Sequence, residues 1–443
     1  MKIAYISADF GVHIFGYKGA SIHVREMVNA FRAFGHSVCI FSSAMHDGKV
    51  KDVPAEPVNI EKFEAYKSFY PDNPKDAIRQ GEVIFVEVRP SKEHLEMMQK
   101  LAALDRFLGR KTRLKQELRN LMYNFDLMEQ VGPHLQKWPV DFIYERYSLF
   151  SLAGTRLARE ADVPHILEVN APLAYEQEKM RGLEMKNLAK ELEAHIFQQS
   201  DHVIVVSEAL KSYVLDCGVP EDRVTVLPNG VDVRRFSDSI DGTSIRQTYN
   251  LAGKQLIGFV GSLKPWHGVD SLIYAIDEIS QEFPQAHLLI VGDGPMREKL
   301  ETIVRERNLT GRVTFTGKVE YEEIPQYIAA MDIATAPYPP NENFYFSPIK
   351  LFEYMAMGKP VVAGAIGQIS EIINQPETGL LFEPGNLSQL VENIKLLLSD
   401  ANLRYQIGKA AREFVLRERT WENNANQVIE LAKTLIYRRT SES

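Results

Sequence analysis

The chain has 443 residues, more than one hydrophobic core usually serves, so its length predicts two domains. Its net charge of −8 excludes a general nucleic-acid binder, which needs a surplus of Lys and Arg to neutralise phosphates. Two cysteines, Cys39 and Cys217, exclude a disulfide framework and a cysteine-built zinc site, and they fit a reducing, cytoplasmic environment.

The amino terminus is predicted to be a strand rather than a secretion signal, because Asp9 interrupts it before an apolar segment of signal length can form. Short apolar runs then alternate with segments of helical period, which indicates an α/β fold with a parallel sheet covered on both faces. Strands are predicted at Lys2–Ser7, Ser37–Ser43, Val83–Val88, Asp141–Glu145, His165–Val169, His202–Val206 and Val224–Leu227. Helices are predicted at Ile22–Phe34, Leu152–Glu160 and Leu173–Gln199.

This alternation breaks at the turn-rich stretch 227–232 and the polar run Ser237–Ser244, and then a second series begins. Its strands are predicted at Leu256–Gly261, His287–Gly292, Val313–Gly317, Asp332–Ala336, Pro360–Ala363 and Leu380–Phe382. We therefore expect Rossmann-like domains over 1–236 and 237–420, with a terminal helix over 421–443 that packs back on the first domain. Two such domains would face a central cleft, and ligands would bind beyond the carboxyl ends of the strands.

One segment reverses the sign of the protein's charge. Between Ser91 and Asn120, eight basic residues stand against four acidic ones, a net of +4. Two interpretations are open: a basic amphipathic helix that lies on anionic lipid at the inner face of a membrane, or a solvated helix face that covers the sheet.

Three glycine-containing loops follow predicted strands and could approach a phosphate or a sugar. The first, around Gly19, precedes a helix whose amino terminus could bind an anion. The second carries Lys264 and His267 just before another helix, and the third contains Gly294. None of the three has the Gly-x-Gly-x-x-Gly spacing of a dinucleotide fingerprint, which argues against an NAD-dependent oxidoreductase.

The stretch 346–358 carries more information than these loops. Ser347 as N-cap and Pro348 at the first helical position predict a helix start. Lys350 then lies in the first turn, where the helix dipole disfavours a cation unless an anion binds beside it. Glu353 lies three residues further on and shares its face, so that one helix face offers a cation for a diphosphate and a carboxylate for ribose hydroxyls. The alternative is an ordinary Lys–Glu surface pair.

Taken together, these motifs, in their order and spacing over nearly the whole chain, resemble the retaining GT-B glycosyltransferases of family 4. The pieces that carry the resemblance are the loop around Gly19, Gly35–Val38, Leu227–Asp232, Phe259–Leu263, Val291–Pro295 and Glu353–Val362. The resemblance implies a nucleotide-diphosphate sugar as donor, a hydroxyl acceptor and no metal or other cofactor. It also implies that Glu353 holds the donor ribose, that Glu371 lies near the donor and that Gly19 places its backbone beside the donor phosphate.

The chain departs from the family's pattern at several positions. Tyr345 replaces the first glutamate of the family's E-x7-E motif, and Ser262 and His267 stand where the diphosphate loop usually has Arg and Lys. A histidine that often follows the strand Asp141–Glu145 is replaced by Arg146. We infer that Lys264 and Lys350 supply the missing charge and that Arg146 binds acceptor or sugar.

The expected reaction is same-face attack by an acceptor hydroxyl with retention of configuration, in which stabilisation of the leaving diphosphate is the largest catalytic term. A double displacement would need a carboxylate nucleophile, for which Glu168 is the candidate. A nucleotide-sugar epimerase or hydrolase and a degenerate scaffold that only binds the donor are the alternatives. Exopolysaccharide, lipid-linked and small-molecule glycosides are all open as products.

Overall fold

A computed structural model describes residues 1–16, 18–45, 81–341 and 343–442. The chain forms two compact units, one of Met1–Pro228 with Asn424–Ser443 and one of Asn229–Asn423. Of the described helices, none is both long and apolar enough to cross a membrane.

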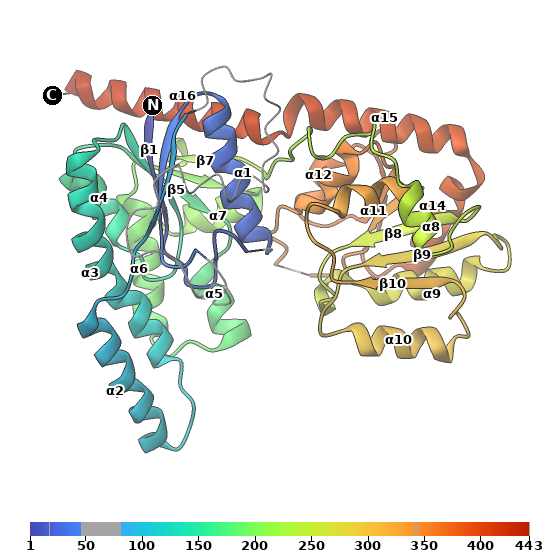
Figure 1. Ribbon diagram of the computed structural model, residues 1–443, viewed down its shortest axis with the longest axis horizontal. Coiled ribbons are helices and arrows are strands. Elements are labelled where there is room, and N and C mark those ends of the chain that lie inside the picture. Colours follow the sequence, from blue (N-terminus) through green and yellow to red (C-terminus); the bar gives the residue numbers. More distant parts are fainter. Residues whose placement is uncertain (17, 46–80, 342, 443) are drawn as a thin grey trace. The chain divides into compact units, whose positions relative to one another are not determined.

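The first unit is built on a parallel sheet, in which seven strands of the described residues have the order β3-β2-β1-β4-β5-β6-β7 (Figure 1). The strands are β1 (Lys2–Ser7), β2 (Ser37–Ser42), β3 (Val83–Glu87), β4 (Phe142–Arg146), β5 (His165–Val169), β6 (His202–Val205) and β7 (Val224–Val226). The helical segments are α1 (Gly19–Ala33), α2 (Lys92–Leu108), α3 (Leu114–Lys137), α4 (Ala153–Glu160), α5 (Leu173–Glu176), η2 (Gln177–Arg181), α6 (Lys186–Gln199), α7 (Glu208–Asp216) and η3 (Glu221–Arg223).

Side chains of β1 alternate between two cores, which shows that the first sheet is covered on both faces. Ala4 and Ile6 belong to a buried cluster with Tyr123 of α3. Tyr5 faces the other way and lies against Tyr144, whose ring meets Phe31 of α1 edge-on.

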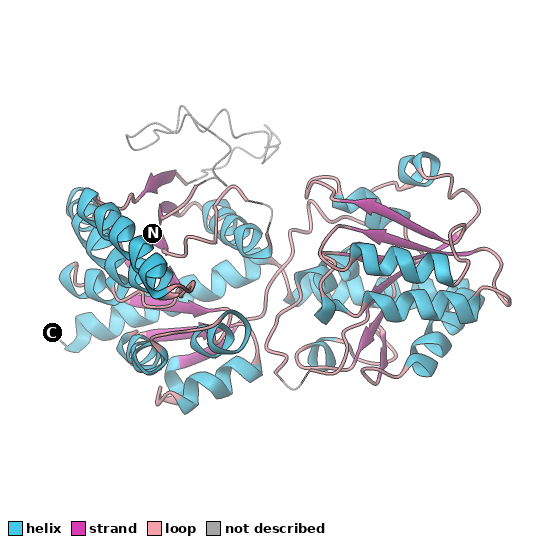
Figure 2. Ribbon diagram, turned by 90° about the horizontal axis from the view of Figure 1, so that it is seen from below, coloured by secondary structure: helices cyan, strands magenta, loops and turns pink. Residues whose placement is uncertain are grey.

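The second unit repeats the plan with six parallel strands among its described residues, in the order β10-β9-β8-β11-β12-β13 (Figure 2). They are β8 (Gln255–Val260), β9 (Ala286–Val291), β10 (Val313–Gly317), β11 (Ile333–Ala336), β12 (Val361–Gly364) and β13 (Leu380–Phe382). The helical segments are α8 (Thr243–Thr248), η4 (Pro265–His267), α9 (Val269–Ile279), α10 (Arg297–Glu306), α11 (Ile324–Ala330), α12 (Ile349–Ala356), α13 (Ile369–Ile372), α14 (Leu387–Ser399) and α15 (Ala401–Glu418).

Side chains of strand β8 also alternate between two buried clusters. Leu256 and Val260 lie in one buried cluster, and Ile257 and Phe259 lie in the other. Two doubly wound parallel sheets therefore confirm the predicted fold class, and the strands are regular because a run buried on both faces is apolar throughout.

Helix α16 (Trp421–Glu442) begins in the second unit and continues into the first. Within the first unit, Arg439 donates two hydrogen bonds of 2.9 Å to the Asp201 carboxylate, and Asn424 donates one of 2.7 Å to the Pro228 carbonyl. The units divide after Pro228 and after Asn423, whereas the sequence placed these boundaries at 236 and 420.

The single helix predicted over Leu173–Gln199 is wrong. The chain turns at Gly182, which has a φ of +82°, and α6 begins anew at Lys186. The cause is a tertiary contact, since the Glu117 carboxylate of α3 accepts 2.8 Å hydrogen bonds from the backbone N–H groups of Glu184 and Met185. This carboxylate fixes the chain just before α6 begins.

Candidate active site

The candidate donor site lies in the second unit, where β8 ends and α12 begins. Gly261 follows β8 with a φ of +145°, and a Cβ at this position would lie 2.6 Å from the Lys350 Nζ. A residue with a Cβ would be strained at this φ and would have to displace the tip of the lysine, so glycine is favoured here. This contact joins the glycine loop after β8 to the helix that carries Lys350.

Lys350 is half-buried as a residue, but its Nζ is buried and has no hydrogen-bond partner among the described residues. Its Nζ lies 4.3 Å from the centre of the Phe259 ring and 5.7 Å from that of Tyr338, so aromatic faces provide its only described electrostatic support apart from Glu353. Burial lowers the pKa of Lys350 to about 7, although Glu353 acts in the opposite direction. Such a group is poised to receive an anion, because a bound phosphate would supply the missing partner.

Glu353, one helical turn further along α12, is 5% exposed. Burial raises the pKa of its carboxyl group to about 7, against a hydrogen bond from Tyr321 and the charges of Lys350 and Arg235. The Tyr321 hydroxyl donates to the Glu353 Oε1 over 3.0 Å, and the Arg235 guanidinium lies 4.9 Å from the centre of the Tyr321 ring. The predicted surface Lys–Glu pair is therefore excluded, since both charged groups are buried.

The start of α12 differs from the prediction. Pro348 is the N-cap and the helix begins at Ile349, so Ser347 does not cap it. The Ser347 Oγ instead accepts a 2.9 Å hydrogen bond from the Asn229 backbone N–H, and the Asn229 side chain donates over 2.7 Å to the Ser347 carbonyl. Ser347 thus attaches the chain before α12 to the stretch that opens the second unit.

The loop between β8 and α9 brings two more predicted residues to this site. The His267 Nδ1–H donates over 2.5 Å to the Ser262 carbonyl. Burial lowers the pKa of His267 to about 3, as do the charges of Lys350 and Lys264, so the ring is neutral at pH 7. His267 therefore adds no positive charge, and its ring lies 5.8 Å from that of Phe259 and 5.7 Å from that of Tyr338, the two rings that face the Lys350 Nζ. The Lys264 Nζ lies 5.7 Å from the Trp266 ring.

Other donor-binding candidates lie on the neighbouring loops. A Cβ at Gly294 would lie 2.7 Å from the backbone of Leu263, so close contact between two loops accounts for this glycine. Glu371 is exposed in the first turn of α13. Tyr345, at the position of the family's first glutamate, is 6% exposed and lies 4.4 Å from the Phe346 ring, centre to centre.

In the first unit, Gly19 opens α1. No described atom lies within 4 Å of the Cβ position at Gly19, and none of the described side chains caps the helix. The preceding loop is fixed by Arg25, a residue that the sequence did not single out. Its buried guanidinium donates to the carbonyls of Ile14 and Gly16 over 2.8 and 2.5 Å. The helix start is thus held in place with its backbone accessible.

Arg146 and Glu168 form one cluster at the carboxyl ends of β4 and β5. Glu168 is 2% exposed. Its carboxylate accepts hydrogen bonds of 3.2 Å from the Arg146 Nη1 and from the Nε2–H of a neutral His23. Tyr144 and Asn170 also donate to it. Burial opposes the charge of Glu168, yet these donors hold its pKa below the usual value. With its oxygens so occupied, Glu168 is placed to orient Arg146 rather than to attack a sugar.

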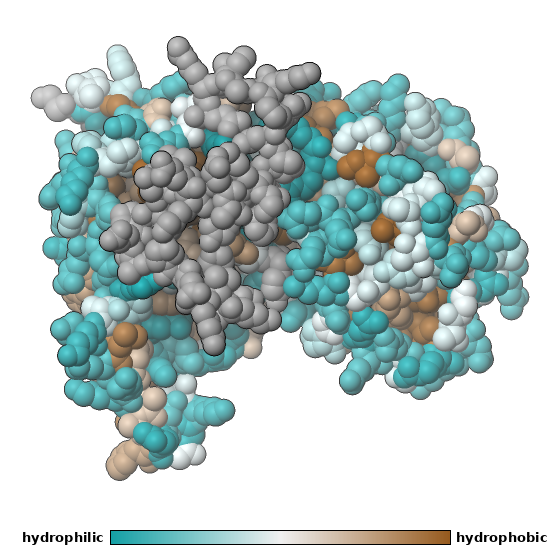
Figure 3. All heavy atoms as spheres, in the orientation of Figure 1, coloured by the Kyte–Doolittle hydropathy of each residue, from teal (hydrophilic) through white to brown (hydrophobic). Residues whose placement is uncertain are grey.

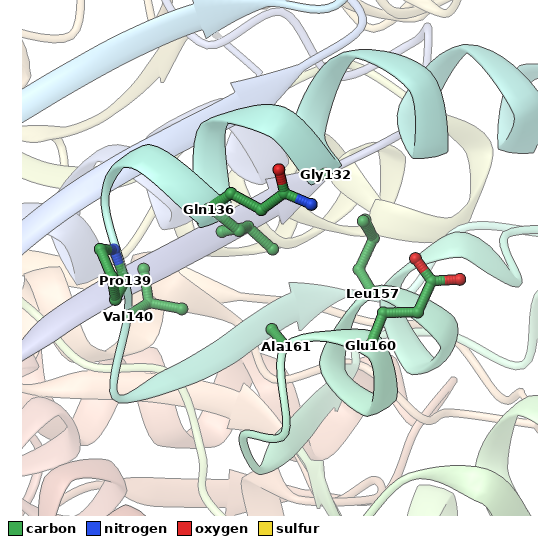
Figure 4. A pocket seen from close by; sticks show the side chains of 8 residues that line it. Gly132, Gln136, Pro139, Val140, Leu157, Glu160 and Ala161 are labelled. Carbon is green, nitrogen blue, oxygen red and sulfur yellow. The ribbon is translucent and has the colours of Figure 1, made fainter.

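A cavity of about 270 Å³ in the first unit lies apart from these residues (Figure 4). It is lined by Leu135 and Gln136 of α3, Leu157 and Glu160 of α4, and Val140, which precedes β4. It therefore opens at the amino end of β4, the edge of the sheet opposite to Arg146 and Glu168. Within 1–16, 18–45, 81–341 and 343–442, no cluster of three or more His, Cys, Asp or Glu side chains could hold a metal ion.

Two doubly wound parallel sheets are the fold of the GT-B glycosyltransferases, and comparisons with known proteins show the family. The family description "Glycosyl transferases group 1" matches residues 242–414, and "Glycosyltransferase Family 4" matches residues 17–235. The chain belongs to the GT-B glycosyltransferases of family 4.

Similar proteins of assigned activity include a GDP-mannose-dependent α-(1-6)-phosphatidylinositol monomannoside mannosyltransferase of Mycobacterium tuberculosis, 28% identical over 57% of this chain and 66% of that protein. A 2-deoxystreptamine glucosyltransferase of Streptomyces kanamyceticus is 26% identical over 64% of this chain and 74% of that protein. The matched segment spans just under two thirds of the length of the first of these relatives.

Two solved structures have the same fold. HepE of Anabaena in complex with UDP has a TM-score of 0.68 at 20% identity and covers 98% of this chain and 100% of its own. Sucrose-phosphate synthase of Thermosynechococcus elongatus has a TM-score of 0.69 at 21% identity and covers 99% of each chain. Likeness at such identities establishes the fold alone.

Proposed function

We propose that the protein transfers a sugar from a nucleotide-diphosphate sugar to an acceptor hydroxyl, with retention of configuration. The observation that carries this proposal is the buried, unpartnered ammonium of Lys350 against Gly261, one turn from the buried carboxylate of Glu353. A cation and a carboxylate on one helix face match the diphosphate and the ribose hydroxyls of a sugar nucleotide.

Lys350 would act on the leaving group. As the bond between the anomeric carbon and the phosphate oxygen breaks, negative charge builds on the diphosphate, and a fixed ammonium in a water-poor site stabilises this charge more than water can. Lys264 supports it from the neighbouring loop, and the backbone N–H groups at the start of α12 offer further donors. Glu353, oriented by Tyr321, holds the ribose.

The acceptor oxygen then bonds to the anomeric carbon on the face that the diphosphate leaves, and its proton passes to the departing phosphate oxygen. This route needs no enzyme nucleophile, which agrees with Glu168 being saturated by four donors. Charge neutralisation by lysines also supports transfer without a divalent metal.

The relatives support a hydroxyl acceptor of either lipid-linked or small-molecule type, since one is named for a phosphatidylinositol mannoside and another for 2-deoxystreptamine. The structures of HepE with UDP and with UDP-glucose support a nucleotide sugar as donor. Lipid-linked glycan synthesis at the cytoplasmic face of a membrane is part of this proposal.

The test is a panel of nucleotide sugars, screened by thermal shift and then by proton NMR of the product with a hydroxyl acceptor. A donor that binds only the folded protein raises its melting temperature, so the panel selects sugar and base together. We expect one donor class to bind and a product that keeps the donor's anomeric configuration. Donor cleavage without acceptor would instead indicate a hydrolase, and binding without turnover a donor-binding scaffold.

A further inference from the structure

The hairpin of α2 and α3 projects from the first unit (Figure 1) and ends in a short loop of unusual composition. Phe107 in the last turn of α2 is 88% exposed, more than any other large apolar side chain of the described residues, and Leu108 beside it is 45% exposed. Burying such side chains is favourable, so an exposed Phe–Leu pair at a projecting end indicates a surface that meets something apolar.

The same loop is basic in a protein of net charge −8. Arg106, Arg110 and Lys111 are exposed and flank the apolar pair, and Arg113 follows at the start of α3. The single acidic residue among 105–113, Asp105, is engaged within the loop. Figure 3 shows apolar surface among hydrophilic surface along this projecting hairpin.

The loop is also held in one conformation. Gly109 closes α2 with a φ of +63°, and the Asp105 Oδ1 accepts hydrogen bonds of 3.1 and 2.6 Å from the N–H and the hydroxyl of Thr112. Arg113 donates over 2.8 Å to the Arg181 carbonyl. A loop ordered before binding loses little entropy on binding, so this geometry favours a docking surface over a frayed helix end.

We propose that residues 106–111 form a docking loop for an anionic lipid surface, in which Phe107 and Leu108 enter the interfacial region and the flanking cations meet lipid phosphates. Two apolar side chains cover far less than the roughly 1,000 Å² that a specific protein interface needs. The flanking cations match lipid headgroups instead, although one of them, Arg110, also pairs with Glu184 over 3.0 Å. The sequence alone indicated a basic helix face anywhere in 91–120, whereas the structure places the contact at the turn. This inference does not depend on the proposed function.

The experiment measures co-sedimentation of the full chain with vesicles of phosphatidylcholine alone and of equal parts phosphatidylcholine and phosphatidylglycerol, without nucleotide sugar. The wild type should bind the mixed vesicles and not the neutral ones. We expect Phe107→Ser/Leu108→Ser to weaken binding by about tenfold or more, and Arg106→Glu/Lys111→Glu to do the same, because each cation near the surface contributes a several-fold effect. Since the variants need no catalysis to be scored, failure here leaves the transferase proposal intact.

The matched control is Phe125→Ser, which removes a phenyl ring that is 69% exposed on the same hairpin but in the middle of α3. It should bind vesicles like the wild type, and all variants should keep the wild-type melting temperature and their turnover of a water-soluble acceptor. The proposal is overturned if the wild type ignores anionic vesicles, if it binds both compositions equally, or if Phe125→Ser is as impaired as the loop variants. If the wild type does not bind vesicles but forms a dimer in gel filtration, and only the loop variants are monomeric, the surface would be assigned to a second copy of the chain.

Discussion

Replacing Lys350 by Met removes the buried charge and keeps the volume of the side chain. The fall in the pKa of Lys350 from 10.5 to about 7 means that burial disfavours its charged form by about 5 kcal/mol in the free protein. Met next to the rings of Phe259 and Tyr338 carries no such penalty and makes favourable contacts of its own. We therefore expect Lys350→Met to unfold at or above the wild-type denaturant midpoint.

In contrast to stability, turnover should fall in Lys350→Met. Loss of one preorganised group that stabilises developing negative charge lowers kcat by about 10²–10³-fold. The assay is release of nucleoside diphosphate from the donor, together with the melting-temperature rise that the diphosphate causes. Both should be lost in Lys350→Met, because the anion would then face an uncharged thioether.

Lys359 provides a matched control, since it is another buried lysine of the same unit but a satisfied one. Its Nζ donates 2.8 Å hydrogen bonds to the carbonyls of Ala329 and Met331. Lys359→Met removes these hydrogen bonds but also a charge that burial disfavours, since burial lowers the pKa of Lys359 to about 8, so its effects on stability oppose each other. Donor affinity and turnover should be kept. The reasoning is refuted if Lys350→Met keeps turnover within threefold of wild type, or if the two variants lose stability and activity in parallel.

Four further results follow from these contacts and from those of Glu168. Affinity for a nucleoside diphosphate should fall by up to about tenfold per pH unit above 7, because the ammonium of Lys350 is the binding form and its pKa in the free protein is about 7. Calorimetry should show this slope in the wild type and an affinity that does not change with pH in Lys350→Arg. The pKa of Glu353 is raised from 4.5 to about 7, so the folded state keeps a proton that the unfolded state loses. The stability contributed by this group is therefore lost as pH rises from 4.5 to 7. Glu353→Gln should abolish this contribution to the pH dependence of the free energy of unfolding, measured by urea titration, and should raise the KM for donor. Tyr321→Phe, which removes the 3.0 Å hydrogen bond to Glu353, should weaken donor binding by about tenfold with kcat little changed, and an unaltered KM would contradict this role. Glu168→Gln should still give a product of retained configuration by NMR, with turnover reduced through a misplaced Arg146, whereas complete loss rescued by added azide would identify Glu168 as a nucleophile after all.

Strands were the most predictable part of this chain. The strands β1, β5, β10 and β13 have the predicted bounds. β1 and β5 lie inside their sheet as largely buried apolar runs, as expected of parallel strands covered on both faces. Helix ends were less predictable. The start of α12 moved from Ser347 because Asn229, 118 residues away, engages its hydroxyl and carbonyl. No local pattern carries such information.

The candidate site was predictable in composition but not in environment. Helical spacing placed Lys350 and Glu353 on one face, yet burial of both depends on rings that come from other strands and loops. His267 was weighed as a helper of the diphosphate, and its neutrality follows from burial and from the charges of Lys350 and Lys264, against the hydrogen bond to the Ser262 carbonyl. Tyr321 was missed because a tyrosine in a loop after β10 gives no sequence signal of its partner.

The central claim, that Lys350 on α12 receives the diphosphate of a sugar nucleotide, is tested most directly by donor turnover in the presence of EDTA. Nucleoside diphosphate release is measured for the wild type and for Lys350→Met with the donor selected by thermal shift and a hydroxyl acceptor. The account predicts release by the wild type that EDTA does not slow, and release at least about a hundredfold slower in the folded variant. Equal rates in the two proteins, or a wild type that uses no nucleotide sugar at all, would contradict it.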